Sequence, residues 1–545
     1  MRRHSNDREG PLARRASPVK RRAVIIGGGP NGLTAAAALA QDSRRGGWQV
    51  TLLERRATLG GLCDHTEFHP GFHAPGPLAD TSRFSPALAA ELKLARHGLV
   101  FRAGGCGTLL APGDSGRDGP PIWLDPDNPA ATASSIAATS PADARAFADF
   151  RDLIARLSPP VARLFTEALP TTEPAGPGDW LTLIGHAARL RRLSDRDIFE
   201  LLRLIPLPVA DWMDASFETP HLQAGLAQAA VADTFLGPRS AGSSATLLIR
   251  EATSGTPVAG GAGALLAALC AAARGAGAEL RPGLAAEGIE VAGGRVRAVA
   301  LADGTTIPAD AVLLACHPAA GLLDLLPPRQ LDSNLARAVQ NHRSRGSAAT
   351  LTLALDNLPA PFGSSSANGT GGSPVTRLRT SPSLAHLELA FNGIRYGELP
   401  SHPALEISVP SARGELTGAG HPLAPEGQAL VTVHASFVPH DGWTAERRAA
   451  LQASILSELE PSIPELERHI LATHLVTPAD LEAEFNLPGG HIHHGEHALD
   501  QLLGLRPAPD LARLPAGLLL ASGGTHPGGG LTGAPGALAA AAAGS

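Results

Sequence analysis

The chain contains little lysine, cysteine and tyrosine. Its 45 basic residues include only two lysines, and aromatic residues make up 4% of the sequence. The four cysteines form no C-x-x-C pair, which disfavours a redox-active dithiol, a cysteine-rich zinc site and a disulfide-stapled secreted scaffold. We therefore expect buried, reduced thiols. The single tyrosine, Tyr396, also disfavours a cage of aromatic side chains around an amine.

Long apolar runs suited to a membrane are missing as well. Ala252–Ala273 and Leu514–Ser545 carry no charged residue, but glycines and prolines interrupt both stretches. A membrane-spanning helix needs about 20 consecutive, mainly apolar residues. Neither stretch is predicted to span a membrane, whereas peripheral contact with a membrane stays open.

The overall composition is that of a globular protein, with 43% hydrophobic and 18% charged residues. A length of 545 residues suggests roughly three or four structural units. The net charge of −6 is unevenly distributed, because residues 1–22 hold eight basic and two acidic side chains and the rest of the chain is acidic. An acidic body argues against nucleic acid as a partner.

We predict that residues 1–22 form a disordered basic tail. Arg21-Arg22 before an apolar run also imitates a twin-arginine signal, but a strand, a glycine turn and a helix are favoured because the glycines have a fingerprint spacing. Abundant arginine, alanine, glycine and proline is typical of a high-GC coding bias and indicates a cytoplasmic bacterial protein. For a eukaryotic source, the arginine-rich tail leaves a mitochondrial presequence open.

The start of the predicted globular part has the pattern of a dinucleotide-binding unit. A strand at Ala23–Ile26 precedes Gly27-Gly28-Gly29-Pro30-Asn31-Gly32, and an alanine-rich helix and a second strand ending in Glu54 follow. The first glycine of G-x-G-x-x-G permits a tight turn, the second lets the backbone approach a pyrophosphate, and the third lets the helix pack closely. The helix N-terminus attracts phosphate, and the acid accepts hydrogen bonds from ribose hydroxyls.

A second glycine pair follows at the end of Glu54–Gly61, with the sequence ERRATLGG. Gly60 and Gly61 would let the chain turn hard against a second phosphate or a ribityl chain. An ordinary loop is an equally good interpretation.

The C-terminal region has a second glycine-rich loop before a helix. We predict a strand at Leu518–Ala521, a loop at Ser522–Gly530, and a last helix that opens at Gly533-Ala534-Pro535 and presents its N–H groups to an anion. Gly528, Gly530 and Gly533 also match G-x-G-x-x-G, but too few residues follow for a second dinucleotide unit of ~30 residues.

The remaining elements are predicted from periodicity and turn residues. The predicted helices are 85–98, 142–157, 193–205, 260–274 and 444–459; the predicted strands are 279–280, 288–291, 295–301, 311–315, 385–390 and 429–437; and 363–372 is a predicted flexible loop.

Together these motifs resemble the phytoene-desaturase-like FAD oxidoreductases, and among them the branch called pyridine nucleotide-disulphide oxidoreductase domain-containing protein 2. The resemblance covers about residues 23–543. It includes HPGF at His69–Phe72, LKLARHGL at Leu92–Leu99 and LAPEGQ at Leu423–Gln428, and it is most specific at Thr477–Leu502 and Thr525–Gly536. Three departures are Gly523 in place of an acid, Ser522 in place of glycine and His493 in place of phenylalanine.

The resemblance implies an α/β fold: a Rossmann-like FAD-binding domain of the glutathione-reductase and amine-oxidase type with an inserted mixed substrate domain. The FAD domain would comprise 23–105, 245–325 and 503–545, with the 280–315 strands completing its sheet, and the substrate domain 106–244 and 326–502. A separate NAD(P) module is not expected. The expected FAD-binding residues are Gly27, Gly29, Pro30, Asn31, Gly32, Glu54, Arg55, Gly60, Gly61, Ala286, Gly524, Gly530, Leu531, Thr532 and Gly533.

The densest cluster of titratable residues is Gly489–His497. A metal site is disfavoured because, in a strand, His491 and His493 would share a face while His494 points away. The resemblance places His491 and His494 in a wall above the flavin, which makes them catalytic candidates; a structural role in a turn is equally open. His526 in the C-terminal loop either contacts the flavin or caps the loop.

The favoured function is an FAD-dependent desaturase, dehydrogenase or oxidase that removes hydride from a small apolar organic substrate. The scarcity of aromatics suggests a pocket lined by Leu, Ala, Phe and Trp. Oxygen, a quinone or another small-molecule electron acceptor would reoxidise the flavin. Two alternatives stay open: a flavin-dependent isomerase without net redox change, and a non-catalytic FAD-bound scaffold or regulator. The sequence leaves the oligomeric state undetermined.

Overall fold

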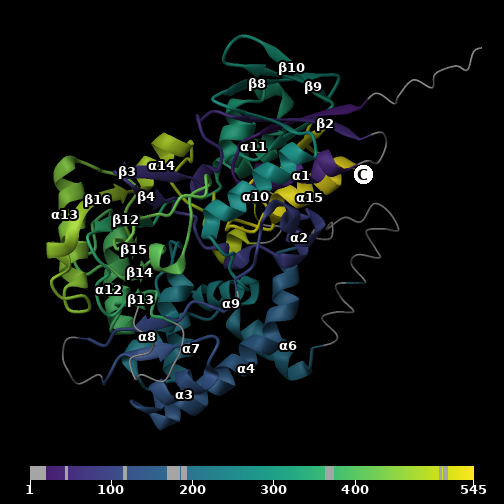
Figure 1. The fold of residues 1–545 in the computed structure, drawn as a ribbon. Helices are drawn as coiled ribbons and strands as arrows, with labels where there is room; N and C mark the ends of the chain where they lie inside the picture. The colour runs from purple at the N-terminus through teal and green to yellow at the C-terminus, as the bar shows by residue number, and fades with distance from the viewer. Residues whose placement is uncertain are drawn as a thin grey trace, which may run out of the picture.

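The computed structural model describes residues 20–42, 47–102, 104–113, 119–167, 185, 193–362, 374–502, 506 and 513–544. Figure 1 shows three regions: a sheet with α1, α10 and α15 beside it, a large second sheet, and a group of helices below. None of the helices in the described ranges is both long and apolar enough to cross a membrane.

The first region is built on a five-stranded parallel sheet. Its strand order is β17 (Leu518–Leu520), β11 (Ala311–Leu314), β1 (Arg21–Ile26), β2 (Trp48–Glu54) and β7 (Glu279–Pro282). Strands from both ends of the chain therefore share one sheet, which confirms the α/β, Rossmann-like fold class. β1 is buried on both faces, as parallel strands usually are.

Alternate residues of β1 enter two different cores. Ala23 and Ile25 pack under the helices α1 (Pro30–Gln41), α10 (Gly261–Gly275) and α15 (Ala534–Gly544). Val24 and Ile26 face the opposite side and pack with residues of β9 (Arg295–Leu301) and of α11 (Ser333–Gln340). The period-two direction of strand side chains thus distributes one short apolar run over two layers.

The second region is a seven-stranded mixed sheet. Its order is β16 (Ile470–Val476), β12 (Ala348–Leu355), β15 (Ala429–Ser436), β14 (Leu405–Ser408), β13 (Arg377–Arg379), β5 (Thr108–Leu110) and β6 (Ile122–Leu124). Only β13 and β5 pair in parallel. α13 (Ala445–Leu459), which Thr444 caps at its N-terminus, packs Leu451, Ile455 and Leu459 into the core of this sheet.

The third region is helical. It comprises α3 (Pro129–Ala137), α4 (Pro141–Leu164), α6 (Asp195–Leu204), α7 (Val209–Ser216), α8 (Pro220–Val231), α9 (Ser243–Thr253) and α12 (Leu384–Ile394). α9 begins close to residue 245, where the FAD domain was expected to resume. However, Leu247, Leu248 and Ile249 pack into the helical core and not under the parallel sheet.

Shorter elements connect these regions. They are the hairpin of β3 (His65–His69) and β4 (Phe72–Pro75), α2 (Pro86–Glu91), and α14 (Pro478–Phe485), which opens on a capping box at Thr477 and Asp480. The predicted helix at 85–98 is divided, because Lys93 has a left-handed backbone conformation and a 3₁₀ turn follows at Leu94–His97.

Three sequence-based expectations were wrong. Segment 385–390 is helical within α12, because Ser383 caps the N-terminus and Leu384, Leu387, Phe391 and Ile394 bury one helical face. The strands between 280 and 315 do not all complete the parallel sheet: β8 (Ala286–Ala292), β9 (Arg295–Leu301) and β10 (Thr306–Pro308) form an antiparallel sheet of their own. β1 includes Arg21 and Arg22, which were assigned to the tail.

Residues 1–19 of the predicted tail and the predicted loop 363–372 lie outside the described residues.

The contact between α1 and α15 leads to a prediction about stability. A Cβ atom on Gly536 would lie 2.0 Å from the carbonyl oxygen of Asn31, which is backbone and cannot move aside cheaply. We expect Gly536→Ala to lower the free energy of unfolding by about 1–3 kcal/mol, as overpacking usually does. Urea unfolding measures this. Gly418→Ala is the control, because a Cβ there meets open space; equal stability of the two variants would contradict the close helix contact.

Candidate functional site

The glycine turn between β1 and α1 is shaped by close backbone contacts. Gly27 has φ +114°, and a Cβ on Gly32 would lie 1.9 Å from the Gly27 carbonyl oxygen, so α1 can approach the turn only with glycine at this position. At Gly29 the nearest atom to a Cβ would be 4.0 Å away. Open space therefore lies over Gly29 at the N-terminus of α1, where a pyrophosphate was expected.

Glu54 at the end of β2 is buried and faces this turn. Its carboxylate accepts hydrogen bonds from the N–H groups of Gly28 (2.7 Å) and Arg56 (2.9 Å). A carboxylate has about four lone-pair sites, so these two bonds leave acceptor capacity for ribose hydroxyls.

The second glycine pair packs against the first turn. Gly60 donates its N–H to the Gly28 carbonyl at 2.9 Å, and a Cβ on Gly61 would lie 3.2 Å from Gly29 Cα. Both glycines have positive φ, so the hard turn expected there is present. The two neighbouring arginines point to different partners. Arg56 donates to the Gly61 carbonyl (3.5 Å), whereas Arg55 is exposed and donates to the carbonyl of Glu484 near the end of α14 (2.5 Å).

Ala286 begins β8, just beyond the end of β7. The loop between these strands lies beside the acid, because the N–H of Leu284 donates to the Glu54 carbonyl (2.9 Å) and that of Gly283 to the Arg56 carbonyl (2.7 Å). Ala286 is thus two residues from a backbone contact to Glu54, although the two are more than 230 residues apart in sequence.

The two ends of the chain meet at this turn. α15 packs on α1 through Gly536, and a Cβ on Gly533 would lie 2.9 Å from Thr34 Oγ1. Neither helix has an acidic residue in its first turn. Asn31 Oδ1 and Thr34 Oγ1 are buried and have no hydrogen-bond partner among the described residues. Two helix N-termini and two unpartnered polar atoms around open space fit an anionic, hydroxyl-bearing ligand such as a dinucleotide.

The C-terminal glycine loop is covered by the histidine segment. A Cβ on Gly529 would lie 2.4 Å from His493 Cα, and one on Gly524 would lie 2.8 Å from the His494 carbonyl. Arg506 joins the two segments: its guanidinium donates to the carbonyls of Gly523 (2.7 Å), Gly495 (3.2 Å) and Glu496 (3.3 Å). Ser522 Oγ lies 3.3 Å from His494 Nδ1.

The remaining loop residues shape the start of α15. Thr532 Oγ1 accepts the N–H of Ala534 at 3.2 Å, and Gly530 lies against Arg83. Leu531 is buried.

The segment His491–His497 is a series of turns, which was one of the interpretations left open for it. The N–H of His494 donates to the His491 carbonyl (2.9 Å), and that of His493 donates to His491 Nδ1 (3.1 Å). The rings of His493 and His497 stack with centroids 4.8 Å apart and an interplanar angle of 6°. The strand argument about shared faces therefore does not apply, because a turn places the side chains according to its own hydrogen bonds.

Burial keeps these imidazoles neutral. It lowers the pKa of His491 to about 4 and the pKa of His494 to about 3, and it holds the pKa of His493 and of His497 well below the usual value.

His526 is a further candidate. Its Nε2 donates to the Glu167 carbonyl at 2.9 Å, and burial lowers its pKa as well. This hydrogen bond joins His526 to the segment just after α4, in the helical region.

A cavity of about 100 Å³ lies where the three regions meet. Its apolar wall comes from Leu78, Ala229, Ala230, Ile249, Ile492 and Leu531, and its polar wall from Asp80, Arg83, Asp233, Arg250, His493 and His497. Gly530 places the cavity beside the C-terminal loop. The lining differs from the expected one, since it contains no Phe or Trp and several charges.

The catalytic candidates expected from the sequence do not line this cavity. His491 and His494 lie behind the cavity wall, whereas His493 and His497 of the same segment line the cavity. Sequence reasoning singled out His493 only as a departure from the resembling family. It missed Arg83, Asp233, Arg250 and Arg506, which no motif marks, because each acquires its meaning from elements distant in sequence.

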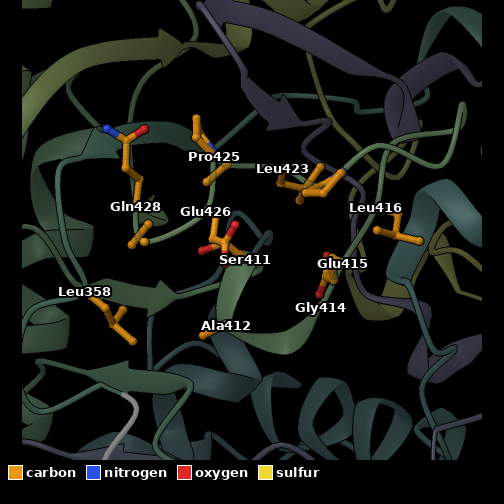
Figure 2. A pocket seen from close by; sticks show the side chains of 14 residues that line it. Leu358, Ser411, Ala412, Gly414, Glu415, Leu416, Leu423, Pro425, Glu426 and Gln428 are labelled. Carbon is orange, nitrogen blue, oxygen red and sulfur yellow. The ribbon is translucent and has the colours of Figure 1, made fainter.

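A second hollow lies at the edge of the large sheet (Figure 2). Residues 411–428 form most of it, and Figure 2 shows Glu426, Ser411 and Gln428 around it. Two of its polar residues have partners: Glu415 pairs with Arg413 at 2.5 Å, and Ser411 Oγ accepts the N–H of Leu430 at 2.9 Å. The Leu416 N–H donates to the Gly260 carbonyl (3.0 Å), so this loop docks on the start of α10.

All four thiols are free, but only Cys63 is fully buried. Burial raises the pKa of Cys316 to about 12, which keeps that thiol protonated. Among the residues that the structure describes, no cluster of three His, Cys, Asp or Glu side chains could hold a metal ion.

Comparison with known proteins bears on this geometry. Residues 25–81 match the family model described as an NAD(P)-binding Rossmann-like domain. Pyridine nucleotide-disulfide oxidoreductase domain-containing protein 2 of Mus musculus is 30% identical over 95% of this chain and 92% of its own length. The chain belongs to this oxidoreductase family. The earlier resemblance to this branch is thereby confirmed.

Solved structures show the same fold at low identity. An oxidoreductase from Methanosarcina mazei is 15% identical, with a TM-score of 0.56 over 96% of this chain and 99% of its own. Putrescine oxidase in complex with putrescine is also 15% identical, with a TM-score of 0.55 over 96% of this chain and 98% of its own. At this identity, the likeness concerns the fold alone.

The buried histidines predict a loss of stability in acid. Unfolded histidine titrates near pH 6.5, whereas burial lowers the pKa of His494 to about 3. The unfolded state then binds more protons as the pH falls below about 6.5, so the contribution is complete above that pH and lost below it. The wild-type protein should lose free energy of unfolding between pH 7 and pH 5. We expect this loss to be about 1–2 kcal/mol smaller in His494→Gln.

Urea unfolding at both pH values measures this difference. His402→Gln is the matched control, because His402 is exposed. If both variants keep the wild-type pH dependence, His494 is not held neutral by the fold.

Proposed function

We propose that the protein is an FAD-dependent oxidoreductase that removes hydride from an organic substrate in the cavity beside the C-terminal glycine loop. One observation carries the proposal: the N-termini of α1 and α15, from opposite ends of the chain, meet at an open glycine turn, and the loop before α15 leads directly to the cavity. A ligand held at both ends of this path must be long, with phosphates at the turn and a ring system at the loop.

The residues divide between the parts of such a ligand. Backbone N–H groups of Gly29–Gly32 and the N-terminus of α1 would hold the pyrophosphate, Glu54 the ribose, and the backbone near Ala286 the adenine. Gly524, Gly530–Gly533 and the N-terminus of α15 would hold the isoalloxazine, where a positive helix end stabilises negative charge. When bound, FAD accepts hydride at its ring and later passes electrons to oxygen, a quinone or another small acceptor.

Both FAD and NAD(P) bind Rossmann-like units, so the matched family model does not choose between them. FAD is favoured because α15 and its loop extend the site from the phosphate turn to the cavity. The open space at Gly29 and the unpartnered Asn31 Oδ1 lie at the phosphate end of this path.

The walls of the cavity supply the rest of the proposed chemistry. Apolar side chains from α8, α9 and the C-terminal loop would hold the substrate and exclude water. His493 Nδ1 has no hydrogen-bond partner among the described residues, and burial holds the pKa of His493 well below its usual value. A neutral imidazole of this kind can hydrogen-bond to a polar group of the substrate.

Gly29→Val tests the cofactor assignment. The Cβ of the new side chain would lie 4.0 Å from the nearest atom, Gly61 Cα, and Gly29 has an ordinary φ of −74°. We expect a folded protein that has lost flavin absorption near ~450 nm. Gly32→Val is the contrast, because a Cβ at 1.9 Å from the Gly27 carbonyl oxygen would disturb the fold itself. Full flavin content in folded Gly29→Val would refute the assignment.

The reaction is tested by anaerobic mixing with a panel of organic substrates. We expect one of them to bleach the flavin absorption, and oxygen or a quinone to restore it, since hydride transfer reduces the ring. Turnover that consumes no acceptor would instead support an isomerase, and a protein that never bleaches would support a scaffold.

A further inference from the structure

The cavity brings two arginines together, and neither forms a salt bridge with the two acids, Asp80 and Asp233, that line the same cavity. Arg250 on α9 donates from Nη1 to the Ala229 carbonyl at 3.3 Å, and Arg83 donates from Nε to Thr253 Oγ1 at 3.1 Å. Within the described part of the chain, neither guanidinium has a carboxylate within 4 Å. Each has five N–H donors and directs one of them at a neutral oxygen. Most of their donors therefore remain available to a ligand.

The two carboxylates of the cavity are engaged elsewhere. Asp233 pairs with His434 at 2.9 Å; despite the opposing effect of burial, this pair lowers the pKa of Asp233, and Asp233 raises the pKa of His434. Asp80 Oδ1 accepts the N–H of Ser82 at 3.0 Å. Burial opposes ionisation of Asp80, but the positive charges of Arg377 and Arg250 and this hydrogen bond together lower its pKa. Both acids are thus ionised and have cationic neighbours of their own.

The next layer of charge does not compensate the cavity arginines. Arg377 and Arg379 share a single carboxylate, Glu406, at 3.5 and 2.7 Å. Arg506, also near Arg83, is buried and bonded to backbone carbonyls. Among the described residues, this interior therefore holds more positive than negative charge. Burying unpaired charge is costly, so a site of this kind is completed by an anion.

The two arginines lie on different sides of the cavity. Arg83 lies against Gly530 of the C-terminal loop, where a Cβ would be 2.6 Å from its Nη1. Burial, with a smaller effect of the positive charge of Arg250, lowers the pKa of Arg83 to about 10 against the opposing effect of Asp80 and Asp233, so Arg83 stays charged at neutral pH. Arg250 projects from α9 on the helical side, next to the apolar Ile249 and Ala230. An anionic group between them would have an apolar wall on its other side.

We propose that the cavity binds an organic carboxylate with an apolar body, and that Arg250, assisted by Arg83, binds the carboxylate group. The inference deepens the proposed function by naming its substrate class. It distinguishes this chain from the putrescine oxidase that shares its fold, because a diamine would bring further positive charge beside two arginines. An arginine fork and a carboxylate form paired hydrogen bonds, which lysine cannot reproduce.

Three eight-carbon probes test the proposal on the full-length wild-type protein: octanoate, octanol and octylamine. Binding is measured from the shift in thermal midpoint and, where flavin is bound, from the perturbation of its absorption. We expect octanoate to bind at least about tenfold more tightly than octanol, since a charged hydrogen bond contributes about that much, and octylamine to bind weakest. Equal binding of the three, or preference for octylamine, would overturn the proposal.

Arg250→Gln locates the site. We expect it to weaken octanoate binding about tenfold or more and to leave octanol binding unchanged, with Arg250→Lys intermediate. Arg239→Gln is the matched control, because Arg239 is a half-exposed arginine just before α9 that faces Asp211 and Asp214. Undiminished octanoate binding in folded Arg250→Gln would overturn the assignment, and the comparison of probes on wild type stands even if that variant does not fold.

The outcome is distinguishable from failure of the proposed function. A colourless protein that octanoate still stabilises selectively would support the carboxylate site and refute the FAD assignment. A yellow protein that binds no carboxylate selectively would do the reverse. Loss of flavin from Arg250→Gln with unchanged octanoate binding would show that Arg250 serves the cofactor, which contradicts the proposal.

Discussion

The close contact between α1 and α15 is the constraint on which the rest of this site depends. Gly536 allows the last helix to lie directly on the Asn31 carbonyl, and Gly32 allows the first helix to lie directly on the Gly27 turn. Each contact excludes even a methyl group. As a result, two helix N-termini without acidic residues point to the same place, and their partial positive charges add where an anion would bind.

The histidine segment depends on this arrangement. The glycine loop before α15 has no side chains over much of its length, so His493 can pack directly on Gly529. Arg506 then ties the two segments through backbone carbonyls, and Glu496 pairs with Arg343 and Arg345 on the other side. The imidazoles are thereby removed from water, and their lowered pKa values keep them neutral hydrogen-bonding groups rather than cations in this interior.

In the cavity, side-chain charges without a salt-bridge partner can select the ligand. Asp233 pairs with His434, and Asp80 accepts the backbone N–H of Ser82. The hydrogen bonds of the two arginines, in contrast, go to neutral oxygens. A shared fold therefore does not imply a shared substrate: the same layers of sheet and helix accommodate amines in one protein and, by our proposal, a carboxylate in another. The discriminating side chains lie on α9 and on the segment before α2, outside the glycine motifs.

Local patterns in the sequence determined the dinucleotide unit, because its turn, acid and helix are separated by short, fixed numbers of residues. The C-terminal helix could be predicted from Gly533 and Pro535. Local patterns were misleading where hydrogen bonds or pairing partners decide the outcome: 385–390 became a helix through the cap at Ser383, and β8–β10 formed their own sheet. Only the tertiary structure brought Arg83 and Arg250 together and placed His493, not His491, at the cavity. Such neighbours are set by packing between segments more than a hundred residues apart, and no spacing within the chain encodes that distance.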